Sequence, residues 1–147
     1  MLRAPGLFLT RRYRLSALHQ LGGSGFSPEE DRRVFGACSR LHGHEYILEI
    51  SVTGSPAQET GLLVKREELD NVVRRAILDR FQGRNLSDHF PHTTGEALAR
   101  EFFQLLAASL PGNLRLVAVK VRETSKNFFI ARPARQRRHM ESGGVTS

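Results

Sequence analysis

A strongly alternating segment constrains the fold of this chain most. From Glu45 to Thr53, apolar and polar side chains alternate, which is the pattern of a β-strand with one buried face. His42-Gly43-His44 stands directly before this segment, and residues at i and i+2 of a strand point to the same face, roughly 7 Å apart at their Cα atoms. The two imidazoles can therefore converge on one metal ion. A third histidine would complete a catalytic zinc site with one position left open.

The same two-residue period predicts three further strands. Together with the strand above, they cover residues 7–21, 42–53, 114–123 and 127–131, and residues 61–64 are expected to be extended. The first strand places His19 at its end, and the short link at residues 124–126 makes the last two strands a hairpin. In the third strand, one face is expected to carry Val117, Val119, Val121 and Glu123.

Between the second and third strands the period changes to that of helices. Apolar residues spaced by three and four predict one helix from Leu69 to Phe81 and a second helix around residues 98–106. Thr93 and Glu96 have the spacing of a capping box at the start of the second helix. Strands and helices are thus segregated in the order strand, strand, helix, helix, strand, strand, which predicts an α+β fold.

Length and composition indicate a single soluble domain. The chain has 147 residues, of which 39% are hydrophobic and 25% charged, and no apolar run approaches the roughly 20 residues that span a bilayer. We expect one domain over residues 1–132 and a basic, disordered tail over residues 133–147. The single cysteine, Cys38, fits a reducing compartment, and no signal peptide is recognisable. These features predict a cytoplasmic protein.

The net charge of +7 raises the question of an anionic partner. Arginine pairs at residues 11–12, 32–33 and 74–75 and the run from Arg132 to His139 carry much of the excess. No nucleic-acid-binding motif accompanies the charge, so we expect neither a nucleic-acid nor a membrane partner. A positive surface also steers anionic small molecules toward a protein, and this is the partner class that we expect.

Five segments of the chain resemble one known family. In chain order they are LSALH, RVFGACSRLHGHEY, TGLLVKREEL, TTGEALA and VRETSKNF, and the 6-pyruvoyl-tetrahydropterin synthase and 6-carboxytetrahydropterin synthase family has them in the same order. The resemblance covers residues 7–131. It implies a T-fold, which is an antiparallel four-stranded sheet with two helices on one face. It further implies that three subunits close into a barrel, that two trimers stack into a hexamer, and that active sites lie between subunits.

The resemblance also assigns a metal site and a catalytic base. His19, His42 and His44 would bind zinc, for which neutral imidazoles are suitable ligands. The alternative is three scattered surface histidines without a metal. Cys38 would be the general base that moves a proton on the substrate side chain, and the alternative is a buried structural cysteine.

Two further residues are implied to hold the pterin. The carboxylate of Glu123 would accept two hydrogen bonds from the pterin edge, in the way that carboxylates in general pair with a guanidinium. Thr94 would line the pterin pocket. The alternatives are a solvated acid at a strand end for Glu123 and a helix-start residue for Thr94.

The chain departs from the family where a second acid–base pair is expected. The family has Leu-Asp-His followed by an Asn-Leu sequence, and alignment on residues 84–86 places Gln82 and Gly83 at the aspartate and histidine positions. Neither residue can transfer a proton at neutral pH. Asp88 and His89 could supply the pair from the following loop, or they could be an ordinary polar loop pair.

Three functions therefore stay open. The leading one is a zinc-dependent pterin synthase, a lyase acting on 7,8-dihydroneopterin triphosphate. The three-residue gap between Cys38 and the two histidines resembles the 6-carboxy enzymes of queuosine and deazaguanine synthesis, whereas SPEEDRRVFG resembles the 6-pyruvoyl branch. The second function is a pterin- or purine-binding paralogue that keeps zinc but has lost or altered catalysis. The third is a metal-containing interaction protein, which only the basic tail supports.

Overall fold

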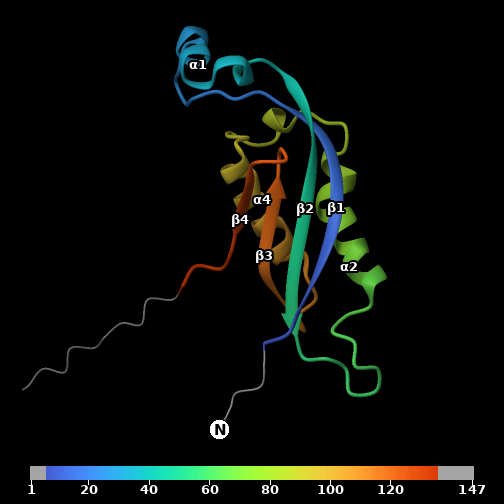
Figure 1. Cartoon of the computed structure of the whole chain (residues 1–147). Helices are drawn as coiled ribbons and strands as arrows, with labels where there is room; N and C mark the ends of the chain where they lie inside the picture. The colour runs from blue at the N-terminus through green and yellow to red at the C-terminus, as the bar shows by residue number, and fades with distance from the viewer. Residues whose placement is uncertain (1–5, 136–147) are drawn as a thin grey trace, which may run out of the picture.

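The computed structural model describes residues 6–135, and Figure 1 shows how they are arranged. In chain order the elements are β1 (Phe8–His19), α1 (Pro28–Phe35), the 3₁₀ turn η1 (Gly36–Ser39), β2 (His42–Gly54), α2 (Arg66–Val73), the π-helical turn η2 (Arg74–Leu78), α3 (Asp79–Phe81), the 3₁₀ turn η3 (Leu86–Asp88), α4 (Gly95–Ser109), β3 (Leu114–Arg122) and β4 (Phe128–Ala131). The strands form one antiparallel sheet in the order β1-β2-β3-β4. Helices α2 and α4 lie on the same face of it (Figure 1). The predicted α+β T-fold is confirmed.

The core lies between the sheet and the two main helices. Tyr46, Leu48, Ile50 and Val52 alternate along β2 with more exposed residues, and all four are buried. They share one hydrophobic cluster with residues of β1, β3, α2 and α4. Full burial of an aliphatic or aromatic side chain stabilises the fold by about 1.5–3 kcal/mol. The alternation in residues 45–53 is thus confirmed as the signal of a half-buried central strand.

Strand β3 breaks the predicted alternation at Val117. Val52 pairs with Leu116 and its neighbour Ser51 pairs with Ala118, so Val117 is skipped as a β-bulge. The prediction that Val117 shares a face with the later valines of β3 is therefore wrong. A bulge inserts one unpaired residue into a strand, and a two-residue sequence period does not reveal the insertion.

Helix α1 was not predicted from the sequence. It begins with a complete capping box, in which the Ser27 hydroxyl accepts from the amide of Glu30 at 3.2 Å and the Glu30 carboxylate accepts from the amide of Ser27 at 3.1 Å. Pro28 occupies the first turn, where its missing N–H costs nothing. None of the residues of α1 is buried, so the helix lacks the apolar face that would have indicated it.

The other helical segments agree with the sequence prediction except in detail. The helix predicted from Leu69 to Phe81 corresponds to α2, η2 and α3, with one wide π turn inside it. Residues 61–64 are not extended, because Gly61 has a φ of 70° and residues 63–64 form a bend, so the prediction of an extended segment there is wrong.

No helix in the described part of the chain is long and apolar enough to cross a membrane. Most of the predicted basic tail, residues 136–147, lies outside the described residues.

Candidate metal centre and adjoining pocket

Three histidines meet where β1 ends and β2 begins. The antiparallel register pairs His19 directly with His42, and His44 follows two residues later on the same face of β2. One ligand nitrogen of each histidine lies within 4.8 Å of the other two. The Nε2 atoms of His19 and His42 are only 2.9 Å apart. The three residues predicted from the sequence as ligands are thus brought together by strand pairing.

Hydrogen bonds to the backbone fix the tautomers of two of these rings. His19 Nδ1 lies 2.8 Å from the carbonyl oxygen of Thr93, and His42 Nδ1 lies 2.6 Å from the carbonyl oxygen of Arg40. A carbonyl can only accept, so each Nδ1 carries a proton, and in its neutral form each ring presents an Nε2 lone pair to the cluster. Two Nε2 atoms 2.9 Å apart need a metal ion or a proton between them, because their lone pairs would otherwise repel each other. A histidine that binds a metal through one ring nitrogen usually donates the N–H of its other ring nitrogen to such a carbonyl, which fixes the orientation of the ring.

Burial favours the neutral form of His19. Its side chain is fully buried, and this loss of solvation lowers the pKa of His19 below its usual value of 6.5. The hydrogen bond to the Thr93 carbonyl acts in the opposite direction but is the weaker effect. A neutral imidazole is the form that binds metal, so the residues present fit a zinc ion.

Glu123 and Tyr46 complete the surroundings of the cluster. Glu123 Oε1 lies 3.5 Å from His19 Nε2 and 3.7 Å from His44 Nε2, so the carboxylate is directed at the histidines. Tyr46 is fully buried, its ring packs near the rings of His19 and His44, and its hydroxyl has no partner among the described residues. Burial and the charge of Glu123 raise the pKa of Tyr46, which therefore stays neutral. Sequence reasoning did not single out Tyr46.

Two threonines precede α4, and the second of them caps the helix. Thr94 is the N-cap residue, and its hydroxyl accepts from the amide of Ala97 at 3.3 Å. The predicted capping box of Thr93 and Glu96 is therefore wrong, because the cap is Thr94 and Ala97 stands three residues after it. Thr93 is buried instead, and its carbonyl is the group that orients His19. Thr94 is thus at the helix start, which was the alternative considered from the sequence. Its hydroxyl oxygen uses one lone pair for the cap and keeps a second lone pair that can accept another hydrogen bond.

Cys38 lies on η1 and is exposed. The alternative of a buried structural cysteine is therefore wrong. Its carbonyl accepts from the amide of Leu21 at 2.9 Å, which ties η1 to the segment after β1. The three-residue metal cluster does not include its thiol.

Gln82 and Gly83, where the resemblance implies an acid–base pair, are hydrogen-bonded to Ser16 at the edge of β1. The Gly83 amide donates to the carbonyl of Ser16 at 2.7 Å, and the Gln82 side-chain oxygen accepts from the amide of Ser16 at 3.3 Å. Gly83 has a φ of 70°, which favours glycine over a residue with a Cβ. Asp88 and His89 lie just beyond, both exposed, with the His89 ring packed edge-on against Phe81.

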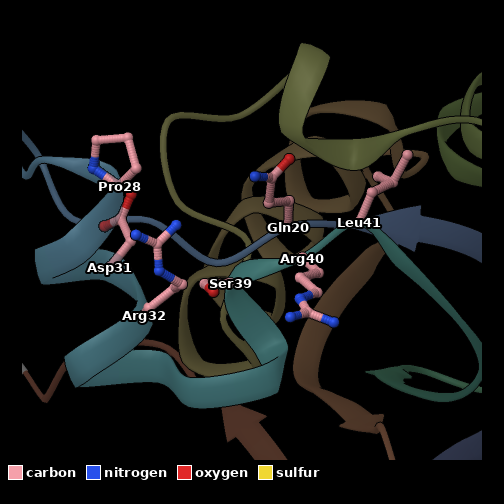
Figure 2. A pocket seen from close by; sticks show the side chains of 7 residues that line it. All are labelled: Gln20, Pro28, Asp31, Arg32, Ser39, Arg40 and Leu41. Carbon is pink, nitrogen blue, oxygen red and sulfur yellow. The ribbon is translucent and has the colours of Figure 1, made fainter.

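A polar pocket of about 450 Å³ lies between α1 and the segment that leads into β2 (Figure 2). It is lined by Gln20, Pro28, Asp31, Arg32, Ser39, Arg40 and Leu41. Gln20 directly follows His19, and Leu41 directly precedes His42. The sequence analysis noted the Arg32-Arg33 pair only as part of the positive charge, because no local pattern shows that α1 folds beside residues 39–41.

Comparisons with known proteins agree with this geometry. The family model described as 6-pyruvoyl tetrahydropterin synthase matches residues 8–134. A 6-pyruvoyl tetrahydrobiopterin synthase of Drosophila melanogaster is 35% identical over 136 residues, covering 88% of this chain and 81% of the relative. A 6-carboxy-5,6,7,8-tetrahydropterin synthase of Bacillus subtilis is 30% identical over 132 residues, covering 85% and 84%. The structure of Caenorhabditis elegans 6-pyruvoyl tetrahydropterin synthase superposes with a TM-score of 0.80 at 26% identity, covering 91% of this chain and all of the other.

Proposed function

Because the chain belongs to the 6-pyruvoyl tetrahydropterin synthase family, we propose that it is a zinc-dependent pterin synthase, a lyase acting on 7,8-dihydroneopterin triphosphate. The observation that carries the proposal is the convergence of His19, His42 and His44, with the Nε2 atoms of His19 and His42 2.9 Å apart. With His44 they would hold zinc and leave one position for substrate oxygens. When bound, zinc would polarise those oxygens and ease removal of a proton from the neighbouring carbon.

Three other residues have proposed roles in this reaction. Cys38 would be the general base, and its exposure on η1 supports access to a substrate. Glu123 would accept hydrogen bonds from the amino and ring N–H groups of the pterin. It would have to turn from the histidines toward the ring, which a side chain at the end of β3 can do. Thr94 would add a hydroxyl to the pterin pocket.

The second acid–base pair decides between turnover and binding alone. Gln82 and Gly83 support the alternative of a pterin- or purine-binding paralogue, since a positioned acid–base group contributes about 10²–10⁴-fold to a rate. Asp88 and His89 are the candidate replacement, and their exposure leaves them free to face a neighbouring subunit. The product, in the 6-pyruvoyl or the 6-carboxy series, is a separate question, because relatives of both kinds match the chain.

We also propose that the active site is completed in a trimer or hexamer. The sheet ends on one side at the short strand β4, with Phe128 and Ile130 exposed. A free strand edge with exposed apolar side chains favours pairing with another copy of the chain. The exposed, unpaired Cys38 supports a reducing compartment such as the cytoplasm.

The decisive experiment incubates the zinc-loaded protein with 7,8-dihydroneopterin triphosphate and separates the products by chromatography. Triphosphate release or a carboxylated pterin that is lost in Cys38→Ala would support the enzyme. A Cys38→Ser variant serves as a matched control for folding, because it keeps the size of the side chain. Pterin binding without any product would contradict the enzyme and favour the binding paralogue. A protein without bound zinc and without pterin affinity would contradict both.

A further inference from the structure

Glu123 is held beside the metal centre by the hairpin between β3 and β4. It directly follows Arg122, the last residue of β3, and the hairpin turn lies at the same end of the sheet as the start of β2 (Figure 1). Its backbone amide donates to the carbonyl of Asn127 at 3.2 Å across the turn. The side chain is mostly buried, and no lysine or arginine of the described residues forms an ion pair with it. The carboxylate is therefore directed at the histidines without a cationic side chain to balance it.

The distances from Glu123 to the rings are those between two ligands of one metal ion. Its Oε1 atom lies 3.5 Å from His19 Nε2 and 3.7 Å from His44 Nε2. An N–H···O hydrogen bond usually measures about 2.7–3.2 Å, so both contacts are too long for one. Zinc binds imidazole nitrogen and carboxylate oxygen at about 2.0–2.2 Å, and two such atoms at tetrahedral positions therefore lie about 3.3–3.6 Å apart. The carboxylate oxygen is thus placed as a further ligand would be.

The polar groups that meet here are acceptors, and a divalent cation is the partner that they share. His19 Nδ1 donates to the carbonyl of Thr93, so the neutral ring directs a lone pair toward Glu123. A proton between His19 and His42 would relieve the repulsion of those two rings but would give Glu123 no hydrogen bond. A buried carboxylate is normally paired or bound to a metal ion. A metal ion at this point could form a bond with each of these groups.

We propose that Glu123 is the fourth ligand of the metal ion in the ligand-free protein and leaves the ion when a pterin ring binds. This inference rests on the proposed function for the metal and the pterin, and it makes the open position of the metal conditional on the ligand. The set of mutually close ligand atoms contains only the three histidines, so Glu123 would approach the ion from the side of His19 and His44. Its three side-chain torsions allow this movement while the hairpin holds its backbone.

The exchange couples recognition of the ring to access to the metal. The amino and ring N–H groups of a pterin would compete with the metal ion for the same carboxylate. When Glu123 pairs with the ring, its bond to the ion breaks, and an oxygen of the ligand's side chain takes the free position. A ligand that has oxygens but no such N–H edge would have to displace Glu123 unaided. The metal would therefore be protected from simple anions until a pterin is present.

Zinc affinity tests the fourth ligand without any substrate. Competition of the full-length protein with a chromophoric chelator measures it, and we expect Glu123→Gln to weaken zinc binding by about 10–100-fold, the usual contribution of groups at a metal centre. Glu123→Asp keeps the charge but is one methylene shorter, so it should weaken binding at least about tenfold. An affinity in either variant equal to that of the unchanged protein would overturn the proposal.

Glu45→Gln is the matched control. It removes the same charge from the residue next to His44, but Glu45 is exposed and forms its ion pair with Arg14, at 3.2 Å. Because solvent and salt screen an exposed charge, the zinc affinity should change less than about twofold. Equal weakening by Glu45→Gln and Glu123→Gln would show a general effect of charge and would contradict direct binding by Glu123.

Cobalt(II) in place of zinc follows the exchange itself, because its visible absorption depends on the number and kind of its ligands. The ligand-free spectrum should change in Glu123→Gln and stay the same in Glu45→Gln. Neopterin, which carries both the N–H edge and side-chain hydroxyls, should change the spectrum of the unchanged protein. Identical ligand-free spectra of the unchanged protein and Glu123→Gln would refute the fourth ligand.

The outcomes separate this inference from the proposed function. Unchanged zinc affinity in Glu123→Gln, together with loss of turnover of 7,8-dihydroneopterin triphosphate, would refute the fourth ligand and leave the pterin synthase standing. Weaker zinc binding in Glu123→Gln, without any turnover by the unchanged protein, would keep the fourth ligand and refute the synthase. A protein that binds no zinc would refute both.

Discussion

Tyr46 and Tyr13 are the two tyrosines of the chain, and their hydroxyls differ in what they contact. Tyr46 is fully buried, and its hydroxyl finds no hydrogen-bond partner among the described residues. Tyr13 is half-buried on β1, and its hydroxyl donates to Asp70 Oδ1 of α2 at 2.7 Å. Replacing each by phenylalanine removes one oxygen atom and little else. The two substitutions should therefore change the free energy of unfolding in opposite directions.

The expected magnitudes follow from these contacts. A buried polar group without a partner costs about 1–3 kcal/mol, so Tyr46→Phe should raise the free energy of unfolding by about 1 kcal/mol. A hydrogen bond to a charged group contributes about 1.5–3 kcal/mol when it is well shielded. Solvent screens the Tyr13–Asp70 bond, since the Asp70 side chain is 33% exposed. Tyr13→Phe should thus lower the free energy of unfolding by about 1 kcal/mol.

Urea unfolding of both variants, followed by circular dichroism in a chelating buffer, measures the difference. The slope of free energy against urea should be the same in all three proteins, so that the midpoints report stability directly. The melting temperatures should move by about 2–4 °C in opposite directions. A Tyr46→Phe variant that is less stable than the unchanged protein by 1 kcal/mol or more would refute the reasoning, because it would show that the hydroxyl is bonded.

Three further outcomes are expected. Zinc at a hundredfold excess over its dissociation constant should stabilise the protein by about 2.7 kcal/mol and raise its melting temperature by about 5–10 °C. This shift should vanish in His44→Ala and persist in His92→Ala, a control at an exposed histidine outside the cluster; equal shifts in both would argue against the site. Thr94→Ala should lower the free energy of unfolding by about 1 kcal/mol through loss of the α4 cap, and Thr94→Ser should restore it in the same melts. In metal-free protein, burial keeps the pKa of His19 below 6.5, so the unfolded chain takes up a proton at about pH 6.5 while the folded chain does not. The stability carried by this group is present above pH 6.5 and decreases below it, and urea midpoints that rise from pH 7.5 to 5.5 would contradict this sign.

Local patterns in the sequence were sufficient for most of the fold. The alternation over residues 45–53 and the helical period between Leu69 and Phe81 are signals of single elements, and burial of one face is enough to produce them. The bulge at Val117 and helix α1 were missed for related reasons. An inserted residue leaves no trace in a two-residue period, and a helix without a buried face has no apolar stripe.

Some features of the candidate site could be predicted from the sequence, and others depend on the tertiary structure. The sequence by itself determined that His42 and His44 share a face of a strand, because that spacing depends only on backbone geometry. Only the tertiary structure decided that His19 pairs with His42, that Thr93 and Arg40 accept from the two Nδ1 atoms, and that Arg32 of α1 lines one pocket with Arg40. These contacts join residues from separate elements, and their positions depend on strand register and packing, which no short stretch of sequence contains.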